Sequence, residues 1–69
     1  MKLTINGKEL SFKEANLDIS KLLKTLNIEE QVVAISLNTE IVKKEKWGDT
    51  PLKEKDTLEL LHFMGGGAR

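Results

Sequence analysis

Residues 17–27 read Leu-Asp-Ile-Ser-Lys-Leu-Leu-Lys-Thr-Leu-Asn, and they predict an amphipathic helix over about 19–26. Asp18 is a good N-cap residue, and Asn27 can adopt the left-handed conformation that ends a helix. The apolar side chains recur three, four and seven residues apart and form one stripe: Ile19, Leu22, Leu23 and Leu26. Such a stripe needs a sheet to pack against, so strands are expected both before and after the helix in the sequence.

Before the helix, the chain predicts a β-hairpin. Residues 2–6 and 9–13 alternate polar and apolar side chains, as strands with one buried face do. Between them, Asn6-Gly7 fits a type I′ turn, because both central residues of that turn need a positive φ.

After the helix, a second hairpin is expected. Residues 31–37 are rich in Val and Ile, Asn38-Thr39 marks a turn, and 40–42 forms a short returning strand. Apolar residues on both faces of 31–37 indicate a central strand. Strict alternation puts Val33, Ile35 and Leu37 on one face and Val32, Ala34 and Ser36 on the other.

The last third of the chain begins with a charged segment, 43–49, expected to be a loop with one short helical turn. Pro51 cannot donate to a strand ladder, and Lys55-Asp56 signals another turn. Residues 57–63 then form the last strand, with Leu58 and Leu60 facing one way and Leu61 and Phe63 the other.

Composition narrows the possible functions. The 69 residues suffice for one small domain, and 11 basic residues balance 11 acidic ones, which argues against a nucleic-acid binder. There is no cysteine and one histidine, so thiolate metal sites and cysteine nucleophiles are excluded.

No apolar run approaches the roughly 18 residues of a membrane span, so no membrane partner is expected and the cytoplasm is the expected compartment.

The order of elements predicts an α+β fold of the ubiquitin-like β-grasp type. We expect a mixed sheet of four to five strands, one main helix packed on one face, and a flexible C-terminal glycine tail. The domain would span 1–63 and the tail 64–69, because three successive glycines lose much entropy on ordering.

The tail is the segment that points to chemistry. Gly65-Gly66-Gly67 lacks the lysine and the following helix of a phosphate loop. It is instead a thread without side chains that can enter a narrow channel of a second protein and present a carboxylate there. A linker or residues added in cloning would explain the same composition, since Ala68 and Arg69 follow.

An ordered set of short motifs resembles the ThiS family over essentially the whole chain. The set comprises Asn6-Gly7, 32–38 (Val-Val-Ala-Ile-Ser-Leu-Asn), Ile41-Val42, Lys46-Trp47, Thr50-Pro51-Leu52, 55–60 (Lys-Asp-Thr-Leu-Glu-Leu) and 63–67 (Phe-Met-Gly-Gly-Gly). The resemblance implies a β-grasp sulfur carrier of thiamin biosynthesis that is not itself an enzyme. It also strengthens the interpretation of the tail as a working segment.

The resemblance further implies the partners and the modified residue. A ThiF-type adenylyltransferase would use ATP and magnesium to adenylate Gly67, with Gly65, Gly66 and Gly67 threaded into it, while this chain binds no cofactor. A sulfur donor would convert the adenylate to a thiocarboxylate, and a ThiG-type thiazole synthase would take the sulfur. The free carrier is expected to be a monomer.

Ala68 and Arg69 depart from the family pattern, which ends at the last glycine. The resemblance extends to some carriers whose short extensions are trimmed by a metalloprotease, and some of those serve amino-acid biosynthesis. Three alternatives therefore stay open: a carrier for molybdopterin or for cysteine/homocysteine synthesis, a ubiquitin-like modifier, and an interaction module with a non-functional tail.

Two further features are interpreted from the residues. Leu61, Phe63 and Met64 adjoin the tail and are expected to form a partner-docking patch. Trp47 is expected to be structural, at an edge of the core. His62 is also expected to be structural, because a lone histidine acting as a base has no nucleophile to serve.

Overall fold

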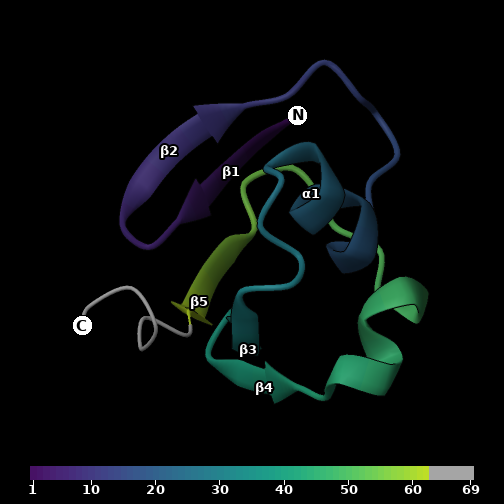
Figure 1. Cartoon of the computed structure of the whole chain (residues 1–69). Coiled ribbons are helices and arrows are strands. Elements are labelled where there is room, and N and C mark those ends of the chain that lie inside the picture. The colour runs from purple at the N-terminus through teal and green to yellow at the C-terminus, as the bar shows by residue number, and fades with distance from the viewer. Residues whose placement is uncertain (63–69) are drawn as a thin grey trace.

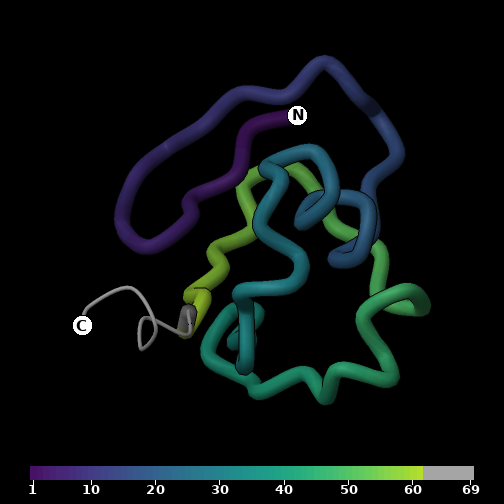
Figure 2. The backbone as a smooth tube through the Cα atoms, in the orientation of Figure 1, coloured from purple at the N-terminus to yellow at the C-terminus, as the bar shows by residue number. Residues whose placement is uncertain are grey.

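The computed structural model describes residues 1–62. In this part of the chain, one α-helix packs against a five-stranded mixed sheet (Figure 1). The elements of this part of the chain are β1 (Lys2–Ile5), β2 (Lys8–Ser11), α1 (Ile19–Thr25), β3 (Val32–Leu37), β4 (Glu40–Val42), the 3-10 helix η1 (Lys44–Asp49) and β5 (Thr57–His62). The strand order is β2-β1-β5-β3-β4, with the two hairpins at opposite ends of the sheet (Figure 2). β5 runs parallel to β1 and antiparallel to β3, which makes the sheet mixed as predicted.

Both hairpins turn through pairs of residues with positive φ. Asn6 and Gly7 have φ of 51° and 82°, as the Asn-Gly signal predicts. Asn38 and Thr39 have φ of 50° and 75°. The left-handed region disfavours a β-branched residue, and Thr39 adopts it in the two-residue turn closed by the pairing of Leu37 with Glu40.

Helix α1 begins at Ile19 as predicted and ends at Thr25, one residue before the predicted end. The backbone N–H of Lys21 donates to Asp18 Oδ1 at 2.7 Å, which satisfies a donor of the first turn. Asn27 has φ of 59°, the left-handed conformation expected just after a helix. The helix is therefore fixed at both ends by local hydrogen-bonding and backbone preferences.

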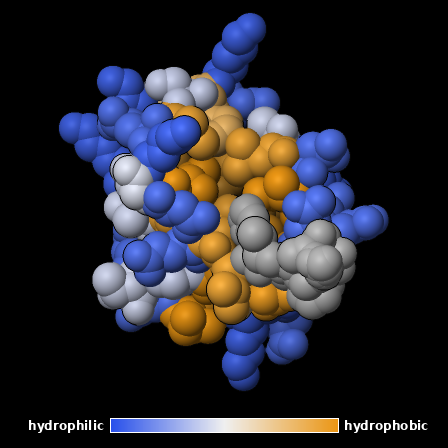
Figure 3. Space-filling view, turned by 60° about the vertical axis from the view of Figure 1, so that its left-hand side comes forward, coloured by the Kyte–Doolittle hydropathy of each residue, from blue (hydrophilic) through white to orange (hydrophobic). Residues whose placement is uncertain are grey.

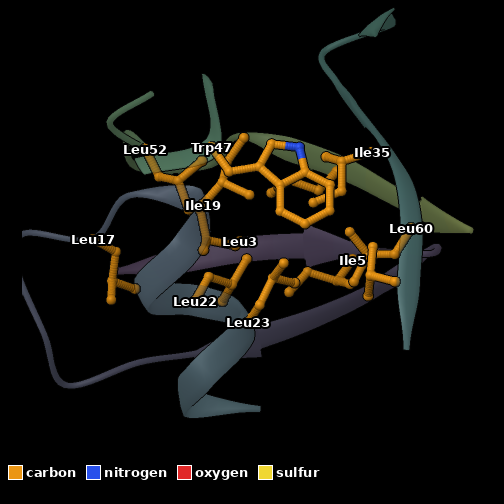
Figure 4. Close-up of a cluster of buried hydrophobic side chains, with 12 residues drawn as sticks. Leu3, Ile5, Leu17, Ile19, Leu22, Leu23, Ile35, Trp47, Leu52 and Leu60 are labelled. Atoms are coloured by element: carbon orange, nitrogen blue, oxygen red, sulfur yellow. The ribbon is translucent and has the colours of Figure 1, made fainter. Parts of the chain in front are cut away.

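The core lies between α1 and the inner face of the sheet, where apolar side chains of α1 and β1 meet (Figure 4). Its buried members are Leu3, Ile5, Leu17, Ile19, Leu22, Leu23, Val32, Ile35, Trp47, Leu52, Leu58 and Leu60. Trp47 enters this cluster from η1, and its Nε1–H donates to the carbonyl of Val42 at 3.0 Å. The prediction that Trp47 is structural is consistent with this burial.

Strand β3 differs from the strict alternation that its sequence predicts. Val32 is buried at 2% exposure, whereas Val33, predicted to share a face with the buried Ile35, is 55% exposed. The register of β3 against β5 shifts between Val32 and Ala34, and such an irregularity changes the face on which the following side chains lie. β3 is an interior strand, but the middle position of the sheet belongs to β5.

The segment between η1 and β5 pairs with the residues just before α1 in an isolated antiparallel β-bridge. Pro51 lies opposite Asp18, and the residues before and after Pro51 form the hydrogen bonds of the bridge. The N–H of Ile19 donates to the carbonyl of Thr50 at 3.2 Å, and that of Leu52 donates to the carbonyl of Leu17 at 2.8 Å. Pro51 thus occupies a bridge position that requires no N–H from it.

Candidate functional site

The face of the sheet that α1 does not cover carries polar residues toward the β2 edge and apolar residues toward the β4 edge. The residues of this face alternate along the strands with the buried Leu3, Ile5, Leu58 and Leu60. Over β1 and β2, the paired positions are polar: Lys2 with Ser11, and Thr4 with both Glu9 and Thr57. Over β3, β4 and β5, apolar residues appear: Leu61 lies opposite Ala34, and Ile41 lies opposite Ser36.

The apolar end of this face forms a shallow hollow of about 280 Å³, which we call the β3–β5 hollow. Its lining residues are Ala34, Ile35, Ser36, Ile41, Glu59, Leu60 and Leu61. Leu61 is 61% exposed and Ile41 is 74% exposed, so large apolar side chains face solvent here. A band of hydrophobic side chains bordered by hydrophilic ones is visible on the side of the molecule drawn in Figure 3. Apolar surface of this kind is typical of protein–protein contact sites.

The structure places one of the predicted site residues. Leu61 lies near the end of β5 with its side chain exposed, as the alternation of β5 predicts. Phe63 and Met64 of the predicted docking patch lie outside the described residues. The same holds for Gly65, Gly66 and Gly67 of the tail, and for Ala68 and Arg69.

Sequence reasoning missed the neighbours of Leu61 in the hollow. Ile41 and Ala34 belong to β4 and β3, and only the cross-strand pairing brings them beside β5. A signal for Ile41 was present, because Val42 packs against the core and adjacent residues of a strand face opposite ways.

The described residues offer little inorganic or acid–base chemistry. Among residues 1–62, no three His, Asp or Glu side chains are arranged to hold a metal ion. None of the polar or charged residues among 1–61 is buried. No helix in the same range has the length and apolar character needed to cross a membrane.

One helix packed on a mixed five-stranded sheet, with the last strand in the middle, defines a ubiquitin-like β-grasp domain. Solved structures agree with this class. A crystal structure of the thiamine biosynthesis protein ThiS from Geobacter metallireducens superposes with a TM-score of 0.81 at 37% identity, covering 97% of this chain and 100% of that one. The solution structure of a thiamine biosynthesis protein from the same organism gives a TM-score of 0.80 at 37% identity, covering 100% of this chain and 91% of that one.

Sequence comparisons give the family. The model of the ThiS family matches residues 3–67. The sulfur carrier protein ThiS of Bacillus subtilis is 35% identical over 65 residues, which cover 94% of this chain and 98% of that protein. The chain belongs to the ThiS family. The prediction of a carrier protein and not an enzyme agrees with this membership.

Two further relatives are longer proteins. The thiazole synthase of Paramagnetospirillum magneticum is 38% identical over 68 residues, which are 99% of this chain and 21% of that protein. The thiazole synthase of Magnetococcus marinus is 34% identical over 67 residues, which are 97% of this chain and 20% of that protein. This chain therefore corresponds to about a fifth of each of these two proteins.

Proposed function

We propose that this chain carries sulfur as a thiocarboxylate at Gly67 and donates it for thiazole formation in thiamin biosynthesis. The observation that carries the proposal is the similarity, over 94% of the chain, to a protein named as a sulfur carrier. The family match also runs to Gly67, the residue that would bear the sulfur. In this proposal Ala68 and Arg69 are removed by a protease, which exposes the carboxylate of Gly67.

The chemistry belongs to an adenylating partner of the ThiF type, which supplies the binding sites for ATP and magnesium. A carboxylate oxygen of Gly67 attacks the α-phosphorus of ATP, and pyrophosphate leaves. A hydrosulfide equivalent from a sulfur donor then attacks the acyl carbon, and AMP leaves. The product is a thiocarboxylate, and this chain contributes the acyl group and the surface by which it is held. We place the reaction in the cytoplasm, where ATP is available.

The β3–β5 hollow supports a docking role close to the tail. Leu61 lines the hollow, and the tail follows it in sequence after a few residues. A partner that covers Leu61 would thus receive Gly65, Gly66 and Gly67 in the same encounter. We include Phe63 and Met64 in this docking surface and propose that the free carrier, with the hollow open, is a monomer.

The acceptor of the sulfur is proposed to be a thiazole synthase of the ThiG type. Nearly the whole of this chain resembles part of two proteins that are named thiazole synthase. Such a likeness supports a functional association between a carrier of this family and the synthase. It favours thiazole formation over molybdopterin or amino-acid synthesis as the destination of the sulfur.

Intact mass of the protein recovered from its native host tests the proposal. We expect a species that ends at Gly67, part of it with one carboxylate oxygen replaced by sulfur. A chain that always retains Ala68 and Arg69 and never gains sulfur would contradict the carrier role and favour an interaction module.

Replacement of Leu61 by glutamate tests the docking surface. We expect Leu61→Glu to weaken binding to the adenylating partner by about tenfold or more, because a charge would be buried in an apolar contact. Isothermal titration with that partner measures the effect. Thr57→Glu is the matched control, since Thr57 lies on the same strand and face, is also exposed, and is likewise two residues from Glu59. Equal affinities of the two variants would show that Leu61 does not dock.

A further inference from the structure

Two asparagines hold β5 through their side chains, one near each end of the strand. At the start of β5, the N–H of Thr57 donates to Asn38 Oδ1 at 2.9 Å. Near its end, the N–H of Leu60 donates to Asn6 Oδ1 at 2.7 Å, and Asn6 Nδ2 donates to the carbonyl of Leu60 at 3.4 Å. Each asparagine is the first residue of a hairpin turn and has a φ near 50°. Each contact thus holds a backbone N–H of β5, but Asn6 also binds the carbonyl of the same residue, whereas Asn38 Nδ2 donates to Asp56 Oδ1 at 3.0 Å.

The Asn6 contact lies where the backbone ladder of β5 ends on one side. β1 pairs with β5 only at Thr4 with Thr57 and at Ile5 with Leu58, within the part of the chain that the structure describes. After Ile5 the chain turns away through Gly7, and the Asn6 side chain takes the place that a further β1 residue would occupy beside Leu60. Asn6 thus extends the parallel ladder by one position without extending the strand.

The other side of β5 is regular at Leu60, which pairs with Ile35, and becomes irregular just beyond it. β3 pairs with this end of β5 through Ala34 with Leu61 and Val32 with His62, and the register shifts between these two pairs. The end of β5 therefore lacks β1 on one side and has a disturbed ladder on the other. The two hydrogen bonds of Asn6 are the added constraint on the direction in which the strand leaves the sheet.

We propose that Asn6 is a positioning residue for the adenylation of this carrier. By fixing Leu60, it sets the direction in which the chain leaves β5, and thus where the tail meets the partner relative to the β3–β5 hollow. This inference rests on the proposed function, because it assumes that the tail is the segment delivered. Small misplacement of a reacting group costs rate even when binding is kept. Asn38, at the other end of β5, does not have this role.

The experiment compares Asn6→Gly with Asn38→Gly in chains that end at Gly67. Glycine keeps the positive φ of each turn and removes only the side chain. The readout is carrier-dependent exchange of pyrophosphate into ATP by the adenylating partner. We expect Asn6→Gly to lower kcat/KM by about tenfold or more, chiefly through kcat. We expect Asn38→Gly to react like the unaltered chain.

A second readout needs no partner. Amide hydrogen exchange in Asn6→Gly is expected to accelerate at Leu60 and Leu61 and to stay unchanged at Thr57, with the reverse pattern in Asn38→Gly. This measurement shows that each substitution acts on its own end of β5. Melting temperatures of the two variants show whether they are destabilised alike.

The outcomes separate this inference from the function on which it rests. If the unaltered chain ending at Gly67 supports no exchange of pyrophosphate, the proposed function fails. If that chain reacts but Asn6→Gly reacts as fast, or both variants slow equally, the positioning role of Asn6 is overturned. Slowing confined to Asn6→Gly, with faster amide exchange at Leu60, supports it.

Discussion

Gly66→Val, in a chain that ends at Gly67, is expected to lower the rate of adenylation by about 100-fold or more. A channel that fits bare backbone has no room for a branched side chain, and valine also restricts the backbone that must pass through it. The measurement is kcat/KM for carrier-dependent exchange of pyrophosphate into ATP.

The matched control for this variant is a glycine elsewhere in the chain. A Cβ added at Gly48 would meet Ser20 Oγ at 3.7 Å, an ordinary contact distance, so Gly48→Ala should react normally. We expect the free energy of unfolding to be unchanged by Gly66→Val, because the sequence predicts that residue 66 belongs to a tail and not to the core. Adenylation of Gly66→Val at the normal rate would contradict the threaded tail.

Leu23→Ala is expected to lower the free energy of unfolding by about 2–5 kcal/mol. Leu23 lies on the buried stripe of α1 and has no exposed surface, so truncation leaves a cavity under the helix. A domain of this length has a total stability of roughly 3–10 kcal/mol, so this loss is a large share of it. Urea unfolding followed by circular dichroism measures the loss.

The chain offers a matched control for Leu23→Ala. Leu61→Ala makes the same chemical change at a side chain that is 61% exposed, and it should alter stability by less than about 0.5 kcal/mol. A loss below about 1 kcal/mol for Leu23→Ala would mean that the apolar stripe does not carry the packing of α1.

Features that depend on local preference were predictable from the sequence. The N-cap at Asp18, the left-handed Asn27 just after α1 and the turn at Asn6-Gly7 each follow from the conformations that these residues favour. The burial of Leu58 and Leu60 follows from alternation in β5. The order of these elements along the chain then indicated the fold class, whereas the order of strands within the sheet came from the structure.

Features that depend on pairing between distant segments were not predictable. Val33 is exposed because of a register shift against β5, which the sequence of β3 does not reveal. The hydrogen bonds between Asn6 and Leu60 join residues 54 positions apart. The neighbours of Leu61 in the β3–β5 hollow come from two other strands and needed the cross-strand register. Of the residues predicted for the candidate site, Leu61 is the one that lies among residues 1–62, and its exposure agrees with the alternation of β5.

The position of β5 in the middle of the sheet has a consequence for how the molecule is made. Among the strands of residues 1–62, β5 is the last to leave the ribosome, yet it lies between β1 and β3, so neither hairpin can join the other before it arrives. Contacts so distant in sequence make folding slower than in a helical domain of this size. A nascent chain that stops before Thr57 lacks the strand that unites the sheet. If the glycines after β5 are the working segment, a partner receives them only after the strand that completes the sheet has been made.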